Sequence, residues 1–323
     1  SLEATSAASI LSLNVGVAGS GGVAVNAAGF GNVITDATSA TISDHSTVTT
    51  VSGGVSLNAE DDSIIRSAAV SVAGTGGIAA GALIGANVVA NDTVAEISGS
   101  KVDSGSTLAL AATGNADILG LSVGVAGAGG GAGLLSLTAA VIANTTRAAV
   151  SGKVEDDDSI TQSDIDANGA VTLSARDNSE INTLAIGVSA AGGGALGAAA
   201  VANVIANVTE AEISNSTVDA DSTLEMEALS SSVIRSLAIG VAGSGGYGLS
   251  FTGMGNGVAN RTSAAIIGST VTAADDVTLA AAEQDLNAED FLDAVRSFVP
   301  DNDNDPDDAD SKTSLQSLTA ALD

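Results

Sequence analysis

The chain has 323 residues, and its 38 Asp and Glu residues outnumber its nine Lys and Arg residues, which gives a formal net charge of −29. This charge argues against nucleic acid and anionic membrane surfaces as partners, because both require clustered basic side chains. The chain has no cysteine for disulfides or thiolate metal sites, too little proline for collagen, and an apolar content of 45%, too high for a disordered acidic tail.

Short segments with period-two alternation occur along the chain and are separated by turns rich in Ser, Asp and Gly. This alternation is typical of strands with one buried face. Because aromatic residues are nearly absent, we expect a thin core of Ala, Val, Ile and Leu. In chain order, the clearest segments are "LSLNVGV" at 11–17, "VSL" at 55–57, "LAL" at 108–110, and "VTL" at 171–173 and 277–279.

A glycine-rich motif, "GVAGSGG" around Val17, returns four times. The spacings between its anchoring valines are 55, 53, 63 and 53 residues, and the four later anchors are Val72, Val125, Val188 and Val241. The longest interval contains extra acidic sequence at 153–169, which predicts a surface loop. A unit of about 53 residues cannot bury its own apolar face, but stacked copies can. The sequence therefore predicts an all-β fold, a parallel β-helix (β-solenoid) of five repeats over residues 1–282.

The repeat length and the short strands lead us to expect two or three coils in each repeat. Each coil adds about 4.8 Å along the solenoid axis, so roughly ten to fifteen coils would form a rod of roughly 50 to 70 Å.

A polar row recurs at fixed distances after the anchors. Position +19 is Asp in the first repeat and Asn in the other four, and position +21 is always Thr. The row consists of Asp36, Asn91, Asn144, Asn207 and Asn260, with Thr38, Thr93, Thr146, Thr209 and Thr262. These positions share the parity of small or apolar residues at +23 and +25, so we expect them to point inward or to lie at a corner.

The same residues fit the N-x-[ST] glycosylation pattern, which requires an exposed side chain. Because these positions are expected to point inward, a structural role is favoured over glycosylation. Asp36 breaks the glycosylation pattern but still provides an oxygen that can accept a hydrogen bond. A buried amide needs partners for two donors and an acceptor, and stacked amides can supply them. With several coils in each repeat, backbone groups of the intervening turns would have to supply them.

Five segments without a charged residue are long enough to cross a bilayer as helices. They are dense in Gly, Ser, Thr and Asn, and they lack both an aromatic belt and a basic flank, so we favour strands and predict no transmembrane segment. The segments are 4–35, 67–91, 118–146, 181–209 and 236–260.

Catalytic chemistry has few candidates. The glycine runs, such as "GAGGGAG" at 127–133, lack the Lys-Ser/Thr of a phosphate-binding loop. His45, the single histidine, lies in the polar turn "SDHST", where a solvated side chain is expected. Carboxylates are plentiful, so a polysaccharide-binding or polysaccharide-cleaving module stays open as the alternative function. We nevertheless predict a protein that is not an enzyme.

The last segment, residues 283–323, differs from the repeats and predicts an acidic helical cap or linker. Apolar residues at helical spacing within 288–299 indicate a short amphipathic helix that Pro300 ends. Alternating acids then resemble the opening of a calcium loop, and a Ca²⁺ site and a solvated linker both stay open here. The candidate ligands are Asp301, Asp303, Asp305, Asp308 and Asp310.

Units such as "SVGVAGAGGGAGLLSLTAAVIANTTRAAVSG" resemble the repeats of giant bacterial leukotoxin-like filamentous adhesins. The resemblance covers roughly residues 5–282. It implies an extracellular β-helical stalk in a protein that displays adhesive or cytotoxic regions elsewhere, and it supplies no catalytic residue.

These observations together predict a structural segment of a larger extracellular or cell-surface protein, in which a stalk holds a functional tip away from the cell. Expected partners are neighbouring repeats or further copies of the chain, with end-to-end filaments as a second arrangement. Host or cell-surface glycans or proteins are the expected targets of the whole protein.

Overall fold

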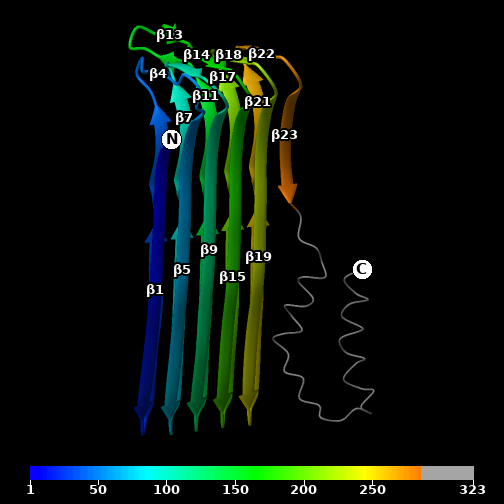
Figure 1. The fold of residues 1–323 in the computed structure, drawn as a ribbon. Coiled ribbons are helices and arrows are strands. Elements are labelled where there is room, and N and C mark those ends of the chain that lie inside the picture. Colours follow the sequence, from blue (N-terminus) through cyan, green and yellow to red (C-terminus); the bar gives the residue numbers. More distant parts are fainter. Residues whose placement is uncertain (285–323) are drawn as a thin grey trace, which may run out of the picture. The chain divides into compact units, whose positions relative to one another are not determined.

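The computed structural model describes residues 1–284, which form one compact unit, Ser1–Gln284. Within this unit every regular element is a β-strand, and nearly all of the pairing is parallel (Figure 1). The expected helical tail at 283–323 lies outside the described residues, except for two positions in the last strand. The candidate calcium ligands between Asp301 and Asp310 therefore lie outside them too.

The strands form four parallel sheets, named A to D in the order in which the chain visits them. Sheet A contains β1 (Leu2–Ser20), β5 (Val55–Thr75), β9 (Leu108–Ala128), β15 (Val171–Ala191), β19 (Leu224–Ser244) and β23 (Val277–Gln284). Sheet B contains β2 (Val23–Ile34), β6 (Ile78–Val89), β10 (Gly131–Ile142), β16 (Gly194–Ile205) and β20 (Tyr247–Val258).

Sheets C and D are shorter. Sheet C contains β3 (Ala37–Ile42), β7 (Asp92–Ser98), β11 (Thr145–Ser151), β17 (Val208–Ser214) and β21 (Arg261–Ile267). Sheet D contains β4 (Thr47–Thr49), β8 (Lys101–Ser104), β14 (Ser163–Ala167), β18 (Ser216–Ala220) and β22 (Thr270–Ala273). One strand from each sheet makes one coil, and coils 1 to 5 begin with β1, β5, β9, β15 and β19.

Each repeat is a single coil, so the prediction of two or three coils per repeat was wrong. Val17 pairs directly with Val72, and Val72 with Val125, in the parallel register of sheet A. Strand β9 alone has 21 residues, about 70 Å at about 3.3 Å per residue, whereas five coils span only about 24 Å. The unit is therefore short along the stacking axis and longest along its strands, instead of the expected 50 to 70 Å rod along that axis.

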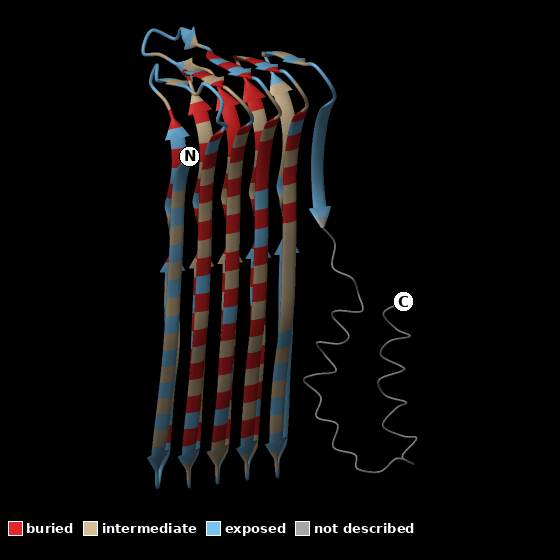
Figure 2. Cartoon of the chain, viewed as in Figure 1, coloured by how far each residue is buried: buried red, intermediate tan, exposed pale blue. Residues whose placement is uncertain are grey.

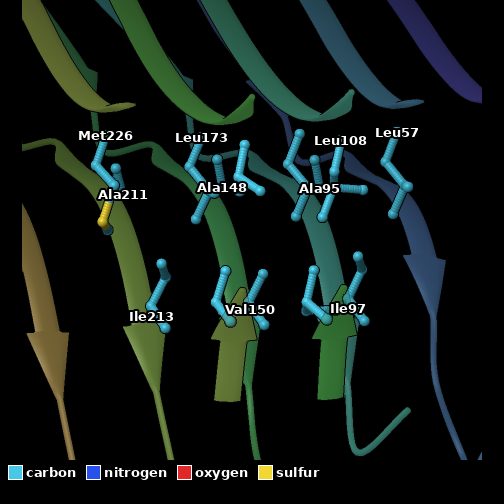
Figure 3. Close-up of a cluster of buried hydrophobic side chains, with 14 of the residues drawn as sticks. Leu57, Ala95, Ile97, Leu108, Ala148, Val150, Leu173, Ala211, Ile213 and Met226 are labelled. Carbon is cyan, nitrogen blue, oxygen red and sulfur yellow. The ribbon is translucent and has the colours of Figure 1, made fainter. Parts of the chain in front are cut away.

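We call the half of the unit in which the strands of sheet A begin the proximal half, and the other half the distal half. The inner residues of the proximal half form the largest apolar cluster. Leu57, Leu108, Leu173 and Met226 of sheet A face Ile97, Val150 and their neighbours in sheet C across the coil (Figure 3). Equivalent residues stack directly above one another because the register is kept from coil to coil. Burial alternates with period two along the long strands of the central coils (Figure 2), as expected for strands with one inner face.

In the distal half, sheets A and B pack against each other over a thinner interior of Ala, Gly, Ser and Leu. This half holds most of each of the five charge-free segments, which are strands and turns of the coil. Gly124 of sheet A faces Leu134 of sheet B, and a Cβ on that glycine would lie 2.6 Å from a Leu134 methyl. No helix in the described residues is long and apolar enough to cross a membrane.

The extra acidic sequence forms a hairpin between β11 and β14, made of β12 (Lys153–Val154) and β13 (Ile160–Thr161). The hairpin lies at the surface and reaches back towards coil 1. The Nζ of Lys153 lies 2.6 Å from the Oδ1 of Asp44, and the Nε2 of His45 lies 3.4 Å from Glu155. The side chain of His45 is 60% exposed, in agreement with the expected polar turn.

Candidate functional site

The asparagine row at +19 forms a continuous ladder inside the stack of coils. Asn91, Asn144 and Asn207 are each less than 5% exposed, on the inner face that the alternation predicts. Each side-chain Oδ1 accepts a hydrogen bond from the backbone N–H of the equivalent residue in the preceding coil. The four N···O distances, from Asp36 to Asn260, are 3.0, 3.1, 3.0 and 3.1 Å.

The contact is direct because each repeat is one coil, so the intervening turns have no part in it. The amide nitrogen Nδ2 points the other way, across the coil to the inner face of sheet A, where it donates to Asp or Ser side chains. The acceptors are Asp61 and Ser63 for Asn91, Asp177 for Asn144, Asp177 and Ser179 for Asn207, and Ser230 and Ser232 for Asn260. Because the amide nitrogens of Asn91, Asn144 and Asn207 are buried and hydrogen-bonded, sugars cannot attach to them in the folded coil.

Coil 1 shows how the pattern adapts to a carboxylate. Asp36 replaces the asparagine and has no N–H to donate, and here Ser6 donates its hydroxyl to the Asp36 Oδ2 at 3.2 Å. The equivalent serine of coil 5, Ser230, accepts from Asn260 instead. A hydroxyl can take either role, so this row tolerates Asp at its end without losing a hydrogen bond.

Asp177 serves two coils at once. Coil 3 has Gly114 at the equivalent position, so it has no acceptor of its own for Asn144. The Oδ2 of Asp177 accepts from the Nδ2 of Asn144 and from the hydroxyl of Thr146, both at 3.4 Å. A Cβ at Gly114 would lie 2.7 Å from that hydroxyl and 3.2 Å from the Asp177 Oδ2, so glycine leaves the space that the carboxylate uses.

The two inner carboxylates, Asp61 and Asp177, are each 1% exposed. Neither forms an ion pair with a side chain of residues 1–284, and each is held by neutral donors. Burial raises the pKa of Asp177 to about 6, and the donors Ser179, Asn144, Thr146 and Asn207 only partly oppose this rise. Burial likewise raises the pKa of Asp61.

The threonine row at +21 contributes less hydrogen bonding than the asparagine row. Thr38, Thr93, Thr146 and Thr209 are buried. Among the described residues, the hydroxyls of Thr38, Thr209 and Thr262 have no hydrogen-bond partner. The row therefore fills space beside the asparagines.

A second inner amide row lies at +15, and the sequence analysis missed it. In four coils its asparagine Nδ2 donates to a Ser or Thr hydroxyl of sheet A at 2.7 or 2.8 Å. The pairs are Asn32 with Ser12, Asn87 with Ser67, Asn203 with Thr183, and Asn256 with Ser236. In coil 3 both partners are absent together, because Ala140 and Gly120 occupy the two places. The same spacing from the anchoring valines could have found this row.

A groove on the outer face of sheet A has a volume of about 440 Å³. Several of its polar groups are engaged with one another or with neighbouring arginines. The Nδ2 of Asn115 donates to Asp62 at 2.7 Å, and Asn178 donates to Asn115 at 3.0 Å. Asp117 pairs with Arg66 and Glu180 pairs with Arg235. The groove therefore carries an outer amide ladder and two ion pairs that connect neighbouring coils.

No family model, curated protein or solved structure matches this chain.

The ladder predicts a large cost for losing one asparagine. Asn144→Ala removes the acceptor of the buried Asn91 N–H and one donor to Asp177, so the free energy of unfolding should fall by about 2 to 3 kcal/mol. Urea denaturation followed by circular dichroism measures this change. Asn178→Ala, on the exposed face of sheet A, is the matched control and should change stability by less than about 0.5 kcal/mol. Equal losses in the two variants would contradict a special role for the inner row.

The raised pKa of Asp177 predicts a pH dependence. Its folded-state pKa of about 6 exceeds the usual value of 3.8, so the folded state binds a proton more readily than the unfolded state. The free energy of unfolding should therefore rise by about 1 kcal/mol as the pH falls from about 7 to about 5, and Asp61 should act in the same direction. Asp177→Ser, which copies the residue of coil 5, should reduce this rise. An unchanged pH slope in that variant would count against the assignment.

The two residues that replace the +15 pair in coil 3 predict that their effects on stability are coupled. The Asn203 Oδ1 has no hydrogen-bond partner among the described residues, because Ala140 stands where another asparagine would donate. Combining Ala140→Asn with Gly120→Ser should restore the row, and the double variant should be more stable than the sum of the single changes by about 1 to 2 kcal/mol. Denaturant melts of all four proteins measure this coupling, and additive effects would show that the two positions are independent.

Proposed function

We propose that the chain is a structural repeat segment, a stalk, of a large extracellular bacterial adhesin or surface fibre. The observation that carries this proposal is the unbroken register. Each strand of sheets A and B in one coil pairs along its length with its counterpart in the next, and the inner asparagines join the same coils. A stack connected in this way transmits load through many hydrogen bonds at once.

The two ends of the stack support the same proposal. Strands β1 and β2 have a pairing partner on one side only, and so does β20. Outward apolar residues are more exposed at the end of the stack than in its middle: Val17 of coil 1 is 74% exposed, whereas the equivalent Val125 of coil 3 is 42% exposed. Open edges of this kind can pair with further coils or with another copy, which is how a solenoid lengthens.

The inner polar groups support a structural role over a catalytic one. The asparagines and carboxylates are buried, and their hydrogen bonds link coils, so a substrate in solution cannot reach them. Polysaccharide binding is the second candidate, because the outer groove presents carboxylates and amides that can hydrogen-bond sugars. The mutual pairing of these groups argues for the stalk.

Immunogold labelling tests the stalk. Antibodies raised against the folded unit should label intact, unpermeabilised cells of the organism that carries this sequence, and brief protease treatment of the surface should remove the label. Gold found only after permeabilisation would overturn the proposal.

A glycan array with the same unit tests the second candidate function, polysaccharide binding. Glycan binding that is lost in Asp62→Asn but kept in Asp103→Asn, which lies outside the groove, would favour polysaccharide recognition.

A further inference from the structure

The outer face of sheet B is apolar at every outward position in all five coils. Apart from the hydroxyl of Tyr247, no side chain there carries a hydrogen-bonding group or a charge. The outward residues of the three central strands are Ile78, Ala80, Ala82, Ile84, Ala86 and Val88, then Gly131, Gly133, Leu135, Leu137, Ala139 and Val141, then Gly194, Leu196, Ala198, Ala200, Ala202 and Val204. We call this surface the B face.

The B face is larger than an ordinary exposed apolar patch. Five strands of 12 residues cover about 40 Å by about 24 Å, or roughly 900 Å². The largest patch on a typical monomer is about 300 to 600 Å², and a standard interface buries about 800 Å² per partner. Ile78 and Ile84 are each 58% exposed and Leu196 is 43% exposed, so the face is open in the described unit. Its area is that of one side of a stable dimer.

The shape of the B face suits another sheet. Its five strands pair in one unbroken parallel register, and many of its outward residues are Gly or Ala, so a second sheet can approach closely. On the outer face of the neighbouring sheet C, Glu96 pairs with Arg147 at 3.1 Å and Glu210 with Arg261 at 3.1 Å. Asp92 and Glu212 are the carboxylates of this face that form no ion pair within residues 1–284. The shape of the face therefore permits face-to-face packing, and the remaining repulsion is of the kind that salt screens.

A lipid phase would also cover apolar side chains, but the edges of the sheet disfavour it. Strands β2 and β20 each lack a pairing partner on one side. In hydrocarbon, their unpaired backbone N–H and C=O groups would each cost several kcal/mol, whereas at a protein interface the same edges stay in water. The acidic composition, with net charge −29, further opposes approach to an anionic membrane.

We propose that the B face binds the B face of a second copy of this chain. A two-fold axis parallel to the central strand β10 gives full overlap of the two faces and also brings large residues against small ones, because coil 3 then faces coil 3, and coil 1 faces coil 5. The bulky row of coil 5, with Tyr247, Leu249 and Phe251, then meets the smaller row of coil 1, with Val23, Val25 and Ala27. This contact is lateral, and it is distinct from the end-to-end pairing of the proposed stalk.

Sedimentation velocity of the full chain tests the proposal. We expect a monomer–dimer equilibrium with a Kd of about 1 μM or tighter, which tightens as added salt screens the acidic surfaces. Leu135→Lys places a charge on the B face at a 39% exposed position and should weaken Kd by at least about tenfold. The matched control Thr172→Lys, on the outer face of the proximal half of sheet A, should leave Kd unchanged. Circular dichroism melts check that both variants fold.

A cysteine variant tests the position of the axis, since the natural chain contains no cysteine. Ala139→Cys lies on β10 and should form a covalent dimer under mild oxidation, whereas Thr172→Cys should not. A wild-type chain that stays monomeric at about 100 μM, well above the expected Kd, would overturn the proposal. So would equal Kd values for the two lysine variants. If the chain instead stays monomeric and floats with phosphatidylcholine vesicles, and Leu135→Lys abolishes this flotation, the B face binds lipid.

Discussion

The structure depends on one repeated hydrogen bond, from the backbone N–H at +19 in one coil to the Oδ1 of the asparagine in the next. Sheet hydrogen bonds alone do not select a register, because a strand shifted by two residues could form an equally regular ladder. The inward amide does select it, since a shift would leave buried donors such as the Asn91 N–H without acceptors. The bond therefore fixes which residues of successive repeats stack, and the core, the groove and the outer faces follow from that alignment.

A fixed alignment also separates charge from apolar surface. Because each position recurs at the same height in every coil, the acids and their pairs, such as Arg66 with Asp117, gather on the proximal half. The charge-free segments gather on the distal half and make its outer faces apolar. A thin interior is what permits this arrangement, since glycines such as Gly124 let sheets A and B approach closely. The same small residues leave little room inside for large apolar side chains, so Leu and Val also occur outside.

The sequence predicted the strands, the parallel stacking and the inward asparagines, because parity and spacing are visible without a structure. It did not predict one coil per repeat. Strand β5 places Asp61, Ser63 and Ser67 inside, so its apolar alternation is interrupted and one long strand resembles short strands joined by polar turns. The +15 row was missed for a related reason, since Ala140 breaks its sequence pattern. Buried polar residues whose partners lie across the coil, on strands distant in the sequence, carry no local signal of their burial.

Asp177 shows how coils depend on one another. A serine there, as at Ser230, can satisfy the asparagine of its own coil, but its hydroxyl is too short to reach the coil before it. The longer carboxylate accepts from Asn207 in its own coil and from Asn144 in the preceding one, and Gly114 opens the space between them. Burying this carboxylate removes water from its negative charge, and this desolvation raises the pKa of Asp177. A repeat can therefore lose an acceptor and keep its donor where a neighbouring coil extends an acceptor into its place, so the adjacent coils help to determine which substitutions the interior tolerates.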